Sequence, residues 1–270
     1  MQTIPEIIGI IAGSGVYPAA MAAGARRAGV TRVAVAAFAG ETDPALEARA
    51  DAWELLKVGQ LGRLSKFLKS QGVKHAVMCG QIAPKNLFAL SPDLRLLMML
   101  ARLKERNAET LFGGIADELA RDGITLLPAT SFLEDHLPAA GHLCGPVRQA
   151  KELLDVEFGL RLARETSRLN IGQTVVVRRG TVLAVEAFEG TNECIKRGGS
   201  MGKGKATAVK VSKPNQDFRF DVPVVGPETI EAAGASGIIV LAIEAGCTLL
   251  LEKEETARLC GQFGVTLIAV

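Results

Sequence analysis

The first half of the chain alternates short apolar runs with stretches in which apolar residues recur at helical spacing. Residues 7–12 and 33–38 are apolar runs of strand length, and residues 16–28 between them are typical of a helix. A strand, a helix and a second strand in this order indicate a parallel sheet covered by helices. We expect further strands at 75–79 and 124–127, and helices at 61–71, 94–103 and 115–121. Residues 1–135 are therefore predicted to form a Rossmann-like N-terminal domain.

The second half predicts a C-terminal mixed α/β domain over residues 147–270. A helix at 147–169 precedes two strands joined at Arg179-Gly180, where glycine permits the positive φ of a hairpin turn. Residues 136–146 contain prolines, glycines and two histidines and are interpreted as the linker. The whole chain is predicted to be a two-domain α/β protein. Later strands are expected at 237–243, 248–251 and 265–270, and helices at 228–233 and 253–263.

The segment from residue 210 to residue 229 contains the most informative polar pattern. Polar and apolar residues alternate from Asp217 to Val222, which predicts a short strand. On that strand Asp217, Arg219 and Asp221 would share one face, so that two carboxylates and a guanidinium stand together. An exposed strand surface without a function shows the same alternation, so the pattern alone leaves both interpretations open.

The stretch immediately upstream adds glycines and positive charge. A β-type run ends near Glu186, and a glycine-rich loop is expected at 198–204. Between Glu193 and Arg219 there are seven Lys or Arg residues against two acids. Glycine backbones and lysine side chains suit phosphate oxygens, and nearby carboxylates suit Mg²⁺ better than a soft metal. The combination predicts a site for a phosphorylated small molecule.

Several motifs of the chain resemble those of one family. They are GIIAGSGVYP at 9–18, KVGQLG at 57–62, NIGQTVVV at 170–177, EAFEGTNECIKR at 186–197 and KVSKPNQDFRFDVPVVGPETI at 210–230. Together they look like the LpxI family, the UDP-2,3-diacylglucosamine pyrophosphatases of bacterial lipid A synthesis. The resemblance implies an Mg²⁺-activated, two-domain enzyme that cuts this lipid-linked sugar nucleotide into UMP and 2,3-diacylglucosamine 1-phosphate. Asn170 stands where the family pattern has an aspartate.

The resemblance and the chemistry of diphosphate hydrolysis together imply roles for individual residues. The substrate is expected in the cleft between the two domains. Asp221 is the central carboxylate, either as an Mg²⁺ or Mn²⁺ ligand or as the group that orients the attacking water. Asp217 is expected as a second metal ligand, and Glu186 as a further catalytic carboxylate. Substrate contacts are expected from Gly13, Ser14, Gly15, Gln81, Gln173, Thr191, Asn192, Lys213 and Arg219.

Charge, cysteine content and apolar run length limit the partners. The formal net charge of +2 is too small to indicate nucleic acid binding. Five widely spaced cysteines without a Cys-x-x-Cys motif indicate reduced thiols and argue against zinc. With neither a secretory signal nor a run long enough to span a bilayer, we expect a cytoplasmic protein. Peripheral contact with the inner membrane and homodimer formation are left open.

Two other functions compete with hydrolysis. The strand–helix–strand opening is shared with nucleotide-cofactor oxidoreductases, but Pro18 replaces the third glycine of the dinucleotide fingerprint and no acid follows the second strand. A non-catalytic sensor would bind the sugar nucleotide without releasing UMP. The apolar helix expected at 94–103 is interpreted as buried, with contact to an acyl chain as the alternative.

Overall fold

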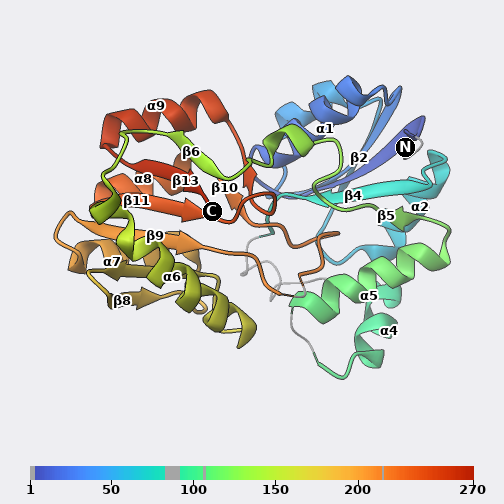
Figure 1. Ribbon diagram of the computed structural model, residues 1–270. Helices are drawn as coiled ribbons and strands as arrows, with labels where there is room; N and C mark the ends of the chain where they lie inside the picture. Colours follow the sequence, from blue (N-terminus) through green and yellow to red (C-terminus); the bar gives the residue numbers. More distant parts are fainter. Residues whose placement is uncertain (1–3, 83–91, 106–107, 215) are drawn as a thin grey trace. The chain divides into compact units, whose positions relative to one another are not determined.

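The computed structural model describes residues 4–82, 92–105, 108–214 and 216–270, and the chain divides into two compact units (Figure 1). The first unit comprises residues 1–134 together with 217–221, and the second unit comprises 135–216 and 222–270. The segment 217–221 therefore belongs to the first unit, whereas the domain boundaries drawn from the sequence placed it in the C-terminal domain. The two-domain α/β class predicted from the sequence is confirmed.

The first unit is built on a five-stranded parallel sheet with the strand order β3-β2-β1-β4-β5. Its central strand, β1 (Ile7–Ala12), is almost completely buried, which explains its uninterrupted apolar run. The edge strand β3 (Ala52–Leu56) is only partly buried and lacks such a run, so the sequence pattern missed it. The other strands are β2 (Arg32–Phe38), β4 (His75–Cys79) and β5 (Thr125–Leu126).

Two helices of the first unit, α2 and α4, share a capping residue, Asp93. Its carboxylate accepts hydrogen bonds from the backbone N–H of Gly62 at 2.6 Å and of Leu96 at 2.9 Å, and so caps the starts of α2 and α4 together. Helix N-termini favour a negative charge at this position. The helical segments are α1 (Tyr17–Ala28), α2 (Leu61–Ser70), α4 (Leu94–Arg102), α5 (Ala108–Arg121) and the 3₁₀ turns Pro44–Arg49 and Glu134–His136.

The second unit contains a six-stranded mixed sheet with the order β6-β13-β11-β9-β7-β8. Strand β6 (Gly141–Cys144) pairs antiparallel with β13 (Thr266–Ala269), so part of the segment interpreted as the linker belongs to this sheet. Strand β6 has only 4 residues and its first two are exposed, so the pattern of apolar residues does not indicate it. The remaining strands are β7 (Thr174–Arg178), β8 (Thr181–Val185), β9 (Ala206–Lys210), β11 (Ile238–Ile243) and the small parallel pair β10 (Val224–Val225) and β12 (Leu249–Leu250).

Helices cover both faces of this sheet. Helix α6 (Ala150–Arg168) packs on the face that carries Val175 and Val177, and Val176 belongs to the core on the opposite face. That alternation is the period of two expected of a strand buried on both sides. The opposite core includes residues of α7 (Thr191–Met201), α8 (Pro227–Ser236) and α9 (Lys253–Phe263).

The expected glycine-rich loop at 198–204 is wrong in its first half, because Gly198 and Gly199 lie inside α7. A Cβ atom on Gly198 would lie 2.5 Å from Cβ of Val176, and one on Gly199 would lie 2.6 Å from the carbonyl oxygen of Ser236. These glycines therefore let α7 pack closely against β7 and α8. They do not form a phosphate-binding loop.

Candidate functional site

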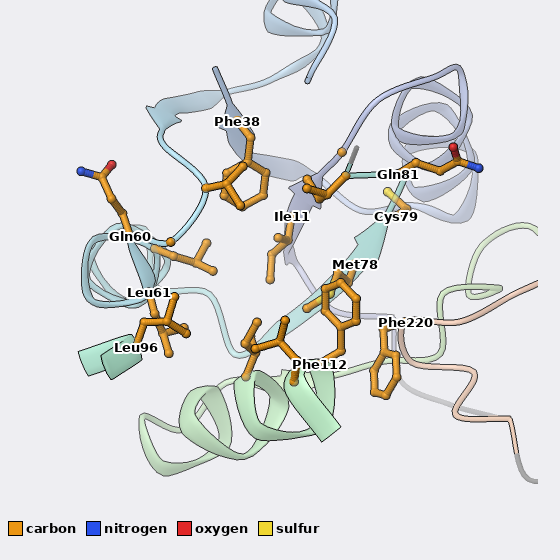
Figure 2. A pocket seen from close by; sticks show the side chains of 18 residues that line it. Ile11, Phe38, Gln60, Leu61, Met78, Cys79, Gln81, Leu96, Phe112 and Phe220 are labelled. Carbon is orange, nitrogen blue, oxygen red and sulfur yellow. The ribbon is translucent and has the colours of Figure 1, made fainter. Parts of the chain in front are cut away.

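The first unit contains a cavity of about 410 Å³ at the carboxyl ends of its strands (Figure 2). Ile11 of β1, Phe38 at the end of β2 and Met78 of β4 line it. The sheet order changes direction at β1, since β2 and β3 lie on one side of it and β4 and β5 on the other. Ligands of open α/β sheets bind at such switch points.

Most of the cavity wall is hydrocarbon. Leu96 of α4 and Leu111, Phe112 and Ile115 of α5 contribute side chains, and the rings of Phe112 and Phe220 lie 5.6 Å apart between centroids. Figure 2 shows the amide groups of Gln60 and Gln81 turned away from these apolar side chains. The cavity is therefore suited to a hydrocarbon ligand, with polar groups at its rim.

The loop after β1 forms part of that rim through a bridge to the loop after β4. Gly13 N–H donates to the carbonyl of Cys79 at 2.8 Å, and Ser14 N–H donates to the carbonyl of Gln81 at 2.7 Å. The Ser14 hydroxyl donates to the same Gln81 carbonyl at 2.9 Å, and Gly15 follows with a φ of +85°. The N–H groups of Gly13 and Ser14 are thus used within the protein, so the substrate contacts expected there could involve these N–H groups only if the bridge opened.

The close packing of this bridge predicts that a side chain at position 13 destabilises the protein. A Cβ atom at this position would lie 2.5 Å from the carbonyl oxygen of Gln81, so Gly13→Ala should lower the free energy of unfolding by about 1–3 kcal/mol. Urea unfolding measures the change. Gly113→Ala is the control, because a Cβ on Gly113 has no atom within 4 Å and alanine favours the helix. If Gly13→Ala unfolds at the same urea concentration as the wild type, the close approach of Gly13 to Gln81 is not as described.

The segment 217–221 is a turn, so the strand predicted over 217–222 is wrong. The carbonyl of Asp217 accepts hydrogen bonds from Phe220 N–H at 3.1 Å and from Asp221 N–H at 3.0 Å, while its side chain accepts from Arg219 N–H at 3.1 Å. Aspartate side chains commonly stabilise turns in this way. The turn is joined to the first unit by Ala129 N–H, which donates to the carbonyl of Phe218 at 2.6 Å.

The same turn pairs Asp217 with Arg219. The guanidinium Nη2 lies 2.6 Å from Oδ2, and Nε lies 2.9 Å from Oδ1 and 3.1 Å from Oδ2. These hydrogen bonds lower the pKa of Asp217, so it remains a carboxylate at neutral pH. Both of its oxygens are engaged by Arg219, and a metal ion could bind Asp217 only if the pair rearranged. Asp221 lies in the same turn, directly after Phe220 of the cavity wall.

The second unit gathers another group of the predicted residues where β8 ends and α7 begins. Glu186 N–H donates to the carbonyl of Thr174 at 2.8 Å, and the hydroxyl of Thr191 lies 3.2 Å from Glu186 Oε1. Gly190, with a φ of +84°, turns the chain between the strand and the helix. Gln173 directly precedes Thr174, and Asn192 follows Thr191 in the first turn of α7.

Glu244 is a further polar residue of the second unit, and the sequence pattern did not identify it. Glu244 follows β11. Its carboxylate accepts a hydrogen bond from Ser212 N–H at 3.0 Å and forms an ion pair with the guanidinium of Arg164 at 3.1 Å. Burial would raise the pKa of Glu244, but the hydrogen bonds from Ser212 and the charge of Arg164 outweigh it and lower the pKa. The signal was available, because a glutamate at the carboxyl end of a parallel strand occupies a common ligand position.

Lys213 and Gln216 complete the polar loop that leads into the turn. Lys213 N–H donates to Gln216 Oε1 at 2.7 Å, which fixes the amide of that glutamine. The amide nitrogen of Gln216 is buried and has no hydrogen-bond partner within the described residues. A buried polar atom without a partner is a candidate ligand contact, and sequence reasoning did not single this residue out. Pro214 lies in a turn, and Asn215 is outside the described residues.

The described parts of the chain contain no preformed metal site, since no three His, Cys, Asp or Glu side chains cluster there. Asp217 and Asp221 belong to the first unit, and Glu186 belongs to the second. Mg²⁺, however, is commonly held by one or two carboxylates together with substrate phosphates. The residues therefore fit a magnesium ion that arrives with a diphosphate better than a resident three-ligand site.

Comparison with known proteins gives concordant matches over nearly the full length. Residues 7–136 match the family described as the LpxI N-terminal domain, and residues 139–268 match the LpxI C-terminal domain. The chain is also 30% identical, over 275 residues, to the UDP-2,3-diacylglucosamine pyrophosphatase LpxI of Caulobacter vibrioides. That match covers 97% of this chain and 97% of the relative.

Proposed function

Since the chain belongs to the LpxI family, we propose that it hydrolyses the diphosphate of UDP-2,3-diacylglucosamine to UMP and 2,3-diacylglucosamine 1-phosphate. The observation that carries this proposal is the apolar cavity of the first unit, which suits an acyl chain of such a substrate. Each methylene transferred from water into an apolar site contributes roughly 0.8 kcal/mol. An acyl chain therefore supplies enough binding energy to hold the molecule while the diphosphate reacts.

Polar groups within residues 213–221 suit the reaction itself. Water must attack one phosphorus while the bond from that phosphorus to the bridging oxygen breaks in line. We assign Asp221 to orienting this water and accepting its proton, since the residue directly follows Phe220 of the cavity wall. Lys213 and Arg219 are assigned to phosphate oxygens, where a cation offsets the developing charge.

The polar cluster of the second unit is assigned to the remainder of the sugar nucleotide. Thr191 and Asn192 stand at the start of α7, where backbone N–H groups favour an anion. Gln173, which directly precedes Thr174, and the buried amide nitrogen of Gln216 are further donors of the second unit. We also propose that the two domains hold the substrate jointly, because ligand sites often occur between domains.

A direct assay tests the activity. Purified protein is incubated with UDP-2,3-diacylglucosamine, and both products are quantified by mass spectrometry. The proposal expects UMP and the acylated sugar phosphate in equal amounts. Stabilisation by the substrate in thermal unfolding without release of UMP would instead identify a non-catalytic sensor.

Activity is expected to depend on Mg²⁺, with Mn²⁺ as a substitute. We expect the ion to enter with the diphosphate, since Arg219 already engages both oxygens of Asp217. Treatment with EDTA followed by dialysis should abolish UMP release, and added Mg²⁺ should restore it. The unfolding temperature should not change on EDTA treatment, which separates loss of catalysis from loss of structure. Full activity in the treated protein would rule the requirement out.

A further inference from the structure

Helix α4 is apolar on two opposite sides. Leu96 and Met99 are each 4% exposed, and Leu96 is part of the cavity wall. On the other side Leu94, Leu97 and Met98 are 72%, 48% and 48% exposed. These three residues have the spacing i, i+3, i+4 and so form one stripe along the helix. The expectation that this helix is buried on most faces is therefore wrong.

We propose that this stripe, Leu94, Leu97 and Met98, docks the protein onto an anionic phospholipid bilayer. The proposal rests on the proposed function, because a substrate with two acyl chains resides in a membrane. Helix α4 forms both the stripe and part of the cavity wall. Docking through the stripe would place the cavity one helix away from the lipid phase, so an acyl chain could transfer with little exposure to water.

The charges of α4 agree with an anionic surface. Residues 94–102 contain no carboxylate, and Lys104 and Glu105 follow. Arg95 is paired with Glu118 and Asp122, so Arg102 is the cation of this helix that can face lipid. The Arg102 side chain is 62% exposed and reaches Glu118 only at 3.4 Å, a distance at which its guanidinium can still contact lipid phosphates. The nearby carboxylate of Asp93 is engaged by the N–H groups of Gly62 and Leu96. Helices that lie in the membrane interface combine an apolar face with flanking cations in this way.

The proposal is tested by sedimenting the full-length protein with vesicles of phosphatidylethanolamine and phosphatidylglycerol. The triple variant Leu94→Gln, Leu97→Gln, Met98→Gln removes the apolar stripe and leaves the cavity residues in place. Its partition into vesicles should fall by about tenfold or more. The control variant Val147→Gln, Leu154→Gln alters residues of the second unit that are 84% and 72% exposed, and it should bind as the wild type does.

Hydrolysis assays separate this proposal from the proposed function. The triple variant should retain turnover of a short-chain, water-soluble analogue and lose turnover of substrate presented in vesicles. Absence of turnover of the soluble analogue by the wild type would refute the function without bearing on vesicle binding. Hydrogen exchange of the wild type provides a measurement that needs no variant: the amides of α4 should gain protection when vesicles are added.

Three results would overturn the docking surface. The first is a wild-type protein that does not sediment with the anionic vesicles. The second is a triple variant that binds them as well as the wild type does. The third is a wild-type dimer in sedimentation velocity that the triple variant converts to a monomer, because a second copy of the chain would then cover the stripe.

Discussion

Replacing Asp221 with asparagine should lower kcat by more than about a hundredfold while substrate affinity changes little. The group that orients the attacking water and takes its proton acts mainly in the transition state, so its loss appears in kcat. The shape of the side chain is preserved, and the backbone N–H of residue 221 still donates to the carbonyl of Asp217. Release of UMP and the thermal unfolding temperature are measured on the same preparation.

A matched variant, Asp117→Asn, tests whether any lost carboxylate in this region has the same effect. Asp117 is exposed on α5, and its charge also raises the pKa of Arg219. We expect near wild-type kinetics for it. If Asp221 is a structural residue, the unfolding temperature of Asp221→Asn will drop while activity per folded molecule persists. Near-native turnover of that variant would remove Asp221 from the active site.

Filling the apolar cavity should raise KM for the diacylated substrate by about tenfold to a hundredfold. Leu111→Trp adds an indole ring to the cavity wall and displaces a few methylenes of a bound acyl chain, each contributing roughly 0.8 kcal/mol. The effect on kcat should be small, because the added ring lies among hydrocarbon side chains. Steady-state kinetics with substrates of decreasing chain length measure the change.

The chain-length series contains its own control. A substrate with very short acyl groups does not reach far into the cavity, so Leu111→Trp should leave its KM unchanged. Leu154→Trp makes the same substitution on α6 of the second unit, at a side chain that is 72% exposed, and should behave as the wild type does. An equal rise of KM for long and short chains would mean that the cavity is not the acyl site.

The amino-acid sequence by itself determined the buried framework. The strands Ile7–Ala12 and His75–Cys79 and the helix Lys253–Phe263 have the bounds that the pattern predicts. A central parallel strand is covered on both faces and needs an uninterrupted apolar run, so its sequence reveals it. The sequence motif at 186–197 also contains Glu186 and Thr191, and the fold brings the Thr191 hydroxyl to 3.2 Å from Glu186 Oε1.

Tertiary contacts decided the rest, because the sequence pattern does not contain them. Phe220 joins a wall made by Leu96 and Phe112, more than a hundred positions earlier in the chain, and only packing brings them together. The alternation at 217–222 suggested a strand, but the carboxylate of Asp217 binds the backbone and guanidinium of Arg219 and closes a turn. The glycines at 198–204 suggested a phosphate loop, but Gly198 lies in α7 and packs against Val176. A side chain at position 198 would clash with Val176.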